Sequence, residues 1–548
     1  MIRFSSNDAH DSRDLPRTSR NGPLANIPFW ALSTFIHLVI FLILFAMVVE
    51  QPRKEPRRQL AQITLVPTRE TPAPKRMRER EVLESLVNTE TPPLPEPIPE
   101  LVLEPELEEL VTDPPTEQTA TQHNELENAL FEVGMLGAAP GARPGKLGDM
   151  QALISAGGNA EAESAIWAAL DWLCRHQSDD GSWKAREFTR QCKKTYKSRN
   201  AARYGPGLGL PRHDVGVTAL ALLAFAGYAH THQYGKYPRY VQAVKRGVKY
   251  LKSVQVSSTD PNKNGRFGSE DHKQWIYDHA IATMAMSELL AMSDDVIVLK
   301  RSVTDAVGLC LRAQNTGFGW KYGIKPGNND TSVTGWMVLA LKTAKNANID
   351  VRKSAYDRAF EGALNWFAHS TSAASGKTGY EAPGDEGSML TNAHTQETYP
   401  YSKELSCMTA VAMLCRLLPG QSRGAPAIKR GVDILIKETP RSAEQKDRQL
   451  STINVYYWYY GSYAMFQFGG SLWKRWNKAM LTELLSSQRR EIDESTGQPL
   501  DEDGSWDPIG EWGAAGGRVY STAMAAMTRQ VYYRYQRVAR ATRQQRPK

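Results

Sequence analysis

The sequence predicts an all-α fold, an α/α toroid of six inner and six outer helices, preceded by one transmembrane helix and a disordered linker. Three observations predict it: an uninterrupted apolar segment near the N-terminus, a Pro- and Glu-rich stretch after it, and a repeated helix–loop–helix pattern beyond about Ala160. The expected organisation is an N-terminal tail (1–27), a transmembrane helix (28–49), a linker (50–150) and a toroid domain (151–548).

The apolar segment "PFWALSTFIHLVIFLILFAMVV", Pro28–Val49, has about the 20 residues that a membrane-spanning helix needs. A cleaved signal peptide has a shorter apolar core and a small-residue cleavage site, so the length favours a retained anchor. Basic residues flank the segment on both sides in nearly equal number, so charge alone leaves the orientation open.

Charge is distributed unevenly along the chain. The formal net charge is +8; segments 51–80 and 534–548 are basic runs, whereas 81–132 contains no Lys or Arg. Such solvated runs do not form a folded basic face, so no nucleic-acid partner is expected. The linker "TPPLPEPIPELVLEPELEELVTDPP" is too polar and Pro-rich to fold.

The repeated unit is an amphipathic helix followed, in its better copies, by Gln, Gly and an aromatic residue. Gly ends the helix or makes the turn, the aromatic ring packs back on the helix, and the Gln side chain holds loop backbone groups. The six units begin near "AALDWLCRHQSDDGSW", "RGVKYLKSVQ", "DAVGLCLRAQNTGFGW", "EGALNWFAHS", "KRGVDILIKE" and "LTELLSSQ".

A second, more apolar helix follows each unit. These helices start near His213, Tyr277, Asp330, Lys403, Ser451 and Arg518, and they are apolar on most faces. Helices of that kind are buried, so they predict an inner ring inside the amphipathic outer helices. Closing the ring would cover both end units, which an open stack leaves exposed.

Three copies carry a Gln…Gly…Trp pattern: Gln177, Gly181 and Trp183; Gln314, Gly317 and Trp320; and Gln488, Gly504 and Trp506. With these QW-type repeats, residues 160–540 resemble the squalene/terpenoid cyclase and protein prenyltransferase β-subunit superfamily. The resemblance implies the toroid fold and a ligand in its central cavity, and several repeats in register are specific for the fold and not for an activity.

The acid motif of the cyclases is degenerate. Their D-x-D-D-T-A-like motif opens an inner helix and its middle Asp protonates the substrate; aligned on Asp330 and Thr331, that position is Asn329 here. An amide cannot supply the strong acid that an alkene requires. The resemblance therefore implies a cavity that binds a ligand without the cyclase proton donor.

No metal or other cofactor is expected. The prenyltransferases hold zinc with an Asp-x-Cys pair and a distant His, and no Asp stands two residues before any of the five Cys. A site from scattered residues such as His279 and Cys407 is the alternative. Five cysteines do not make a disulfide framework in this chain, although Cys174 and Cys192 are candidates for a pair.

The candidate site residues are polar or aromatic and lie on the inner helices. If the toroid is correct, the starts of these helices ring one mouth of the cavity, with helix capping as the alternative reading for the acidic ones. The acid/base candidates are Asp330, Asp278 and His279. The ligand-binding candidates are His213, Asp214, Thr331, Trp336, Glu404, and Tyr456, Tyr457 and Trp458 of the run "YYWYY".

Ser33 and His37 lie one turn apart inside the apolar segment. A titratable side chain at that depth is costly and suggests a function, with helix–helix packing as the alternative. The pattern Ser33-x-x-x-His37, followed by a Pro- and charge-rich extension, resembles the anchor of TonB-type energy transducers. That resemblance implies a proton-channel motor complex as a partner, the inner membrane as the location, a cytoplasmic N-terminus and a periplasmic toroid.

Three functions remain open on the sequence. The first is a membrane-anchored toroid that binds a peptide or an apolar, isoprenoid-like ligand in its cavity. The second is an active isoprenoid cyclase or prenyltransferase that uses Asp330, Asp278 and His279. The third is a structural scaffold of the cell envelope.

Overall fold

The computed structural model describes residues 160–192, 207–293, 295–384, 390–391, 398–399, 406–441, 453–492, 500–510 and 512–531. The chain divides into two compact units, 1–110 and 111–548, and the described residues all lie in the second. Within them, no helix is both long and apolar enough to cross a bilayer. The predicted tail, transmembrane helix and linker lie outside the described residues.

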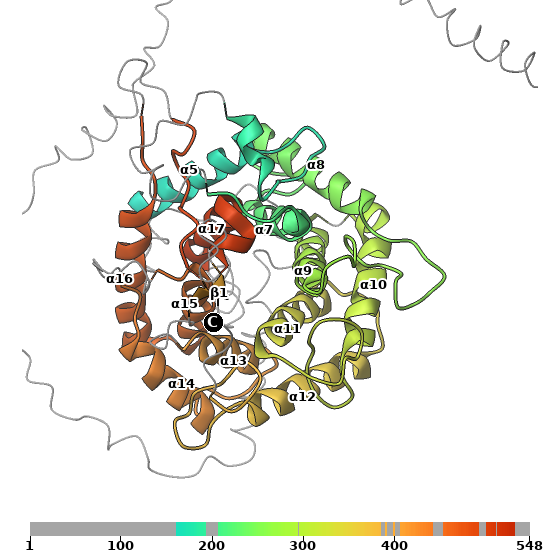
Figure 1. The fold of residues 1–548 in the computed structure, drawn as a ribbon, viewed down its shortest axis with the longest axis vertical. Helices are drawn as coiled ribbons and strands as arrows, with labels where there is room; N and C mark the ends of the chain where they lie inside the picture. The colour runs from blue at the N-terminus through green and yellow to red at the C-terminus, as the bar shows by residue number, and fades with distance from the viewer. Residues whose placement is uncertain are drawn as a thin grey trace, which may run out of the picture. The chain divides into compact units, whose positions relative to one another are not determined.

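Six helices of the described part form an inner ring and six an outer ring (Figure 1). Inner and outer helices alternate along the chain. The outer helices are α5 (Ala160–Arg175), α8 (Pro238–Ser253), α10 (Val296–Ala313), α12 (Lys353–His369), α14 (Pro426–Lys437) and α16 (Gly470–Ser487). The inner helices are α7 (Asp214–Gly227), α9 (Trp275–Ser293), α11 (Thr331–Asn346), α13 (Cys407–Leu417), α15 (Val455–Phe468) and α17 (Gly513–Arg529).

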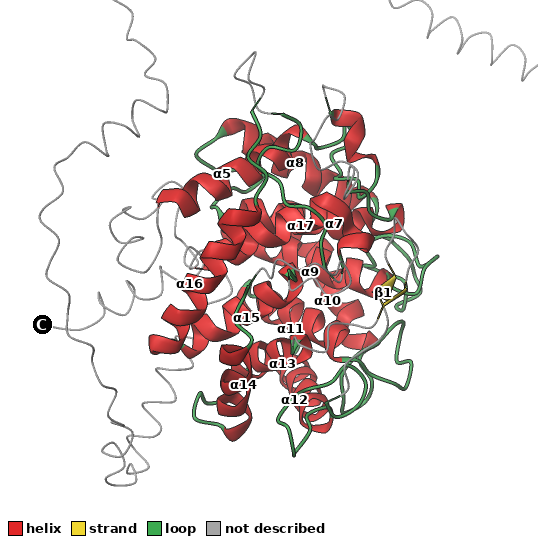
Figure 2. Cartoon of the chain, turned by 60° about the vertical axis from the view of Figure 1, so that its left-hand side comes forward, coloured by secondary structure: helices red, strands yellow, loops and turns green. Residues whose placement is uncertain are grey.

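The ring is closed. Each inner helix contacts the next one along the chain, and α17 contacts α7; in the outer ring α16 contacts α5. The described residues therefore form the predicted α/α toroid. Two short 3₁₀ helices, η1 (Glu187–Gln191) and η2 (Pro211–His213), precede α7. One feature departs from the all-α expectation: an antiparallel pair of two-residue strands, β1 (Leu390–Thr391) and β2 (Thr398–Tyr399), lies between α12 and α13 (Figure 2).

The burial pattern explains why the chain forms two rings. In α9 nearly every residue is buried, as the lack of a polar face predicts. In α8, Tyr240, Val244 and Leu251 are buried whereas Lys and Arg occupy the other face. Inner helices thus pack on all sides, and outer helices cover them with one apolar stripe.

The Gln of the better repeat copies links neighbouring units. Gln177 Nε2 donates to Gly181 O in its own loop (2.8 Å) and to Ala243 O on the next outer helix (2.9 Å). Gln255 and Gln314 make the same pair of bonds one and two units later. The tryptophans pack back on their own helix: Trp320 Nε1 donates to Cys310 O at 2.8 Å. The predicted roles of Gln and Trp are confirmed.

The last unit uses the same Gln to close the ring. Gln488 Nε2 donates to Gly504 O and to Ala165 O of α5, both at 2.9 Å. Gly504 has φ +91°, and a Cβ there would overlap the carbonyl oxygen of Ala168. The turn therefore requires glycine for its backbone conformation and for its close approach to α5. We call this junction of α5 with the 500–507 loop the seam.

Candidate functional site

The described part of the toroid has a pocket at one mouth of the inner ring. Its volume is about 120 Å³, somewhat smaller than a cavity of roughly 150 Å³ that binds benzene. The pocket is lined by Leu210, Arg212, His213, Gly216, Val217, Leu220, Gln274, Tyr277, Asp278, Ile281, Trp336, Tyr456, Trp512, Ala515, Gly516 and Tyr520.

Aromatic rings form an arc along one side of this pocket. Ring centroids are 5.7 Å apart between Tyr277 and Trp512, 6.2 Å between Trp512 and Tyr456, and 6.4 Å between Tyr456 and Trp336. A buried hydrogen bond of 2.8 Å joins the Tyr456 hydroxyl to Ser332 Oγ, which holds this ring in place. The arc offers flat apolar faces that suit an apolar group or a cation.

Polar groups gather on the side formed by η2 and α9. The Asp278 carboxylate lies 3.3 Å from His213 Nδ1 and 3.4 Å from His272 Nε2, and its side chain is only 6% exposed. Gly216 of α7 faces this carboxylate, and a Cβ there would overlap Asp278 Oδ1. The pocket thus combines an aromatic arc with a single carboxylate between two imidazoles.

Asp278 occupies a position that is apolar in most other units. At the start of each aligned inner helix, one side chain accepts a hydrogen bond from a loop backbone N–H: Thr218 from Trp183, His279 from Phe267, Thr334 from Trp320, Thr409 from Thr378 and Thr522 from Trp506. The residue just before this acceptor is Val217, Asp278, Val333, Met408 or Ser521. An acid in this position is costly to bury, so it indicates a specific role.

His279 has the same backbone-binding place as the threonines of the other units. Its Nδ1 accepts from Phe267 N (3.2 Å), and its Nε2 lies 3.2 Å from Ala306 O of α10. Burial lowers the pKa of this imidazole to about 3. The structure places His279 between an inner and an outer helix, outside the pocket lining, where it holds the loop to α9.

Asp330 also lies outside the pocket lining. Its carboxylate caps α11 by accepting from Val333 N (2.6 Å), and it accepts from the Tyr380 hydroxyl at 3.2 Å. Burial raises the pKa of this carboxyl to about 7. The neighbouring Asn329 accepts from Asn315 Nδ2 in the preceding loop, at 2.9 Å. The residues aligned with the cyclase acid motif therefore lie in the helix cap and its loop.

The raised pKa of Asp330 predicts that the protein loses stability as pH rises. The folded state holds the proton up to about pH 7, whereas the ordinary value is 3.8. The stabilisation is therefore complete below about pH 4 and is lost toward pH 7, at up to about 1.4 kcal/mol per pH unit. Denaturant unfolding at several pH values should show that the free energy of unfolding of the wild type falls relative to that of Asp330→Asn over this range. If the difference between the two free energies does not change with pH, the raised pKa of Asp330 is contradicted.

The other predicted site residues divide into two groups. His213, Trp336 and Tyr456 line the pocket together with Asp278. The remaining described candidates are bound elsewhere: Asp214 accepts from Ala185 N, Thr331 donates to Gly379 O, Tyr457 donates to Glu438 O, and Trp458 is buried outside the pocket lining. Glu404, Ser33 and His37 lie outside the described residues.

Several pocket residues were not predicted. Trp512 comes from the turn before α17 and Tyr520 from α17 itself. His272, in the loop before α9, does not line the pocket but lies 3.4 Å from the Asp278 carboxylate that does. The flanking sequences, "EDHKQW" and "EWGAAGG", contain polar and aromatic residues but no recognisable binding motif. Only the position of His272, six residues before Asp278 and close to the helix start, could have suggested it.

In the described part, two separate groups of side chains each bring together three possible metal ligands. One is His213, His272 and Asp278 at the pocket, and the other is His176, Cys192 and Asp501 at the seam. The five cysteines are free, so Cys174 and Cys192 do not form the disulfide that the sequence left open.

No protein-family model and no curated protein sequence matches the chain. Solved structures resemble it in overall fold. An α-1,6-mannanase variant from Salegentibacter has 9% identity and a TM-score of 0.42, over 68% of this chain and 98% of its own. The type II terpene cyclase MstE from Scytonema has 14% identity and a TM-score of 0.37, over 70% and 99%. An α-amylase from Clostridium perfringens has 12% identity and a TM-score of 0.40, over 67% and 97%. At these values the similarities support no conclusion on activity.

Proposed function

We propose that the toroid is a binding protein that holds a peptide or apolar ligand in its mouth pocket, with a polar end of the ligand at Asp278. The observation that carries the proposal is the division of the pocket into an aromatic arc and one buried carboxylate. An apolar body would lie against Trp336, Tyr456 and Trp512, and a hydrogen-bond donor or a cation would reach Asp278.

The size of the pocket limits the part of the ligand that it encloses. A volume of about 120 Å³ fits a single aromatic or isoprenyl group, or one side chain of a peptide. A longer ligand would extend out of the mouth past Arg212 and Gln274. This favours capture of one end of a chain over enclosure of a whole polyprene.

An isoprenoid cyclase or prenyltransferase is the second candidate, because Asp278 places a carboxylate within an aromatic pocket. In that case Asp278 would be the acid or base, since Asp330 and His279 are engaged in the helix cap and the loop contact. The binding function is preferred because the residue aligned with the cyclase proton donor, Asn329, is an amide that bonds to Asn315.

The same proposal includes a location for the protein, which we infer from the N-terminal segment. The apolar stretch 28–49 would anchor the chain in the inner membrane with the toroid in the periplasm. Ser33 and His37 would couple the anchor to a proton-channel complex, so that ligand capture or release responds to the proton gradient.

The test is native mass spectrometry of full-length protein purified gently from its own cells. We expect a retained ligand on the wild type and a loss of about 10–100-fold in affinity in Asp278→Asn, because a hydrogen bond to a charged group contributes about 1.5–3 kcal/mol. Asp357→Asn is the matched control, since that carboxylate is 54% exposed on α12. Conversion of labelled squalene by the wild type would favour the enzyme, and equal loading of both variants would refute the role of Asp278.

A further inference from the structure

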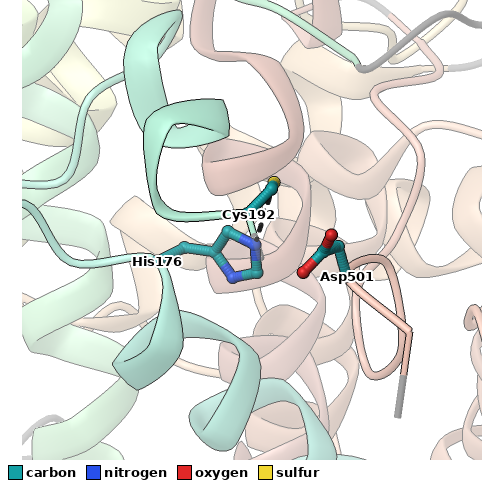
Figure 3. Close-up of side chains that lie close together, drawn as sticks. All are labelled: His176, Cys192 and Asp501. Carbon is teal, nitrogen blue, oxygen red and sulfur yellow. Dashed lines mark hydrogen bonds between the residues drawn. The ribbon is translucent and has the colours of Figure 1, made fainter. Parts of the chain in front are cut away.

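Three side chains that are distant in sequence meet at the seam. His176 directly follows α5, Cys192 follows η1, and Asp501 lies in the loop that precedes α17. Figure 3 shows the imidazole, the thiol and the carboxylate at the three corners of a triangle, and Cys192 Sγ lies 3.6 Å from His176 Nε2. One ligand atom from each of the three residues lies within 4.8 Å of the other two.

A backbone carbonyl sets the tautomer of His176. Its Nδ1 lies 2.8 Å from Trp172 O, which can only accept, so Nδ1 carries the proton. The lone pair is then on Nε2, the atom that faces Cys192. The ring is also stacked on Trp172, with centroids 4.2 Å apart and planes at 20°. Histidines that bind metals are held in this way, with the other ring nitrogen donating to a carbonyl or carboxylate.

Trp172 positions the carboxylate residue as well. Its Nε1 donates to the backbone oxygen of Asp501 at 2.8 Å, across 329 positions of the chain. Arg175 adds a hydrogen bond of 2.9 Å to Asp503 O. Hydrogen bonds from these two side chains to backbone oxygens therefore hold the end of α5 against the loop of Asp501. They do not involve the three ligand atoms, as a preformed site requires.

The chemistry and the spacing of the cluster match a zinc-type ion. Thiolate, imidazole and carboxylate are the ligands that zinc takes in proteins. With bonds of about 2.3 Å to sulfur and about 2.0–2.1 Å to nitrogen, a tetrahedral ion places these two atoms about 3.6 Å apart. The observed separation is 3.6 Å. A thiol–imidazole hydrogen bond has a similar length, so metal binding has to be measured directly.

We propose that His176, Cys192 and Asp501 bind a zinc-class divalent cation that fastens the first helix pair of the ring to the last. The ligands lie on both sides of the seam, where the Gln488 bonds already join the last unit to α5. An ion that binds only the folded state would stabilise the closed ring, because opening the seam separates Asp501 from the other two ligands. Three protein ligands leave the fourth tetrahedral position to water or another donor.

The experiment uses full-length protein purified without chelator and without a polyhistidine tag. Elemental analysis should give about one zinc per chain, and adding Zn²⁺ to metal-stripped protein should raise its melting temperature by a few degrees. Loading with Co²⁺ should produce a near-ultraviolet thiolate-to-cobalt absorption band. This band identifies the seam, since the other group, His213, His272 and Asp278, contains no sulfur.

Two variants and two controls decide the assignment. Cys192→Ser and Asp501→Asn should each lower the metal affinity at least tenfold, and Cys192→Ser should abolish the cobalt–sulfur band. Cys174→Ser, a half-buried cysteine outside the cluster, and Asp278→Asn should bind the ion like the wild type. The proposal is overturned if no zinc binds at about 1 mM, if the band survives Cys192→Ser, or if Asp278→Asn alone removes the ion. If the mouth pocket fails to bind a ligand, the proposed function fails, but the assignment of the metal site at the seam does not.

Discussion

Replacing Trp320 with alanine should lower the free energy of unfolding by about 3–5 kcal/mol, as expected for a buried tryptophan. The ring is fully buried between α10 and α11, and its Nε1 donates to Cys310 O at 2.8 Å. Truncation would leave a cavity and remove the hydrogen bond to Cys310 O at the same place. Urea unfolding followed by circular dichroism measures the effect.

Phe318→Ala is the matched control for this prediction. Phe318 belongs to the same loop, two residues earlier, but it is 41% exposed. Its backbone contacts to Asn315 and Gln314 do not involve the side chain, so the variant should differ from the wild type by less than about 1 kcal/mol. Equal destabilisation by the two variants would show that the tryptophan does not have the role assigned to it in the repeat.

Replacing Arg518 with methionine should lower the free energy of unfolding by a similar amount, about 3–5 kcal/mol. The Arg518 guanidinium is fully buried at the seam and bonds to Asp507 Oδ1 (2.7 Å) and Ser505 Oγ (2.9 Å); Glu502 lies 3.5 Å away. Methionine fills a similar space but removes the Arg518 cation from Glu502 and from Asp507, whose other oxygen stays paired with Arg489. The midpoint of chemical unfolding reports the loss.

A second substitution tests the electrostatic cause. Adding Glu502→Gln to Arg518→Met should recover part of the lost stability, because it removes one of the carboxylates left behind. Arg301→Met, at a side chain that is 92% exposed on α10, should change stability by less than about 1 kcal/mol. If the double variant is no more stable than Arg518→Met, packing and not charge explains the effect.

The repeat was predictable because its interactions are local. In the units of Gln177 and Gln314 the Gln, Gly and Trp lie within a few residues of one another, and their bonds in the structure are those that the spacing predicts. The apolar inner helices and the amphipathic outer helices likewise follow from periodicity. Ring closure was inferred from the need to cover the two end units, and the contact between α17 and α7 confirms it.

The pocket was predictable in part. His213, Asp278, Trp336 and Tyr456 line it, as a ring of inner-helix starts predicts. Asp278 and His279 are neighbours in sequence, but adjacent residues of a helix point about 100° apart. That rotation puts Asp278 in the pocket and His279 against α10. Spacing cannot decide which of two adjacent polar residues faces the cavity without the orientation of the helix.

The amino-acid sequence by itself determined the two kinds of helix, their alternation and the loop chemistry, since each depends on residues close together in the chain. Only the tertiary structure decided which side chains share a site. His272 meets Asp278 because a loop folds back on α9, and Asp501 meets His176 because the last unit returns to the first. Contacts of that kind depend on how the helices are rotated and on how the ring closes, and neither leaves a periodic signal in the sequence.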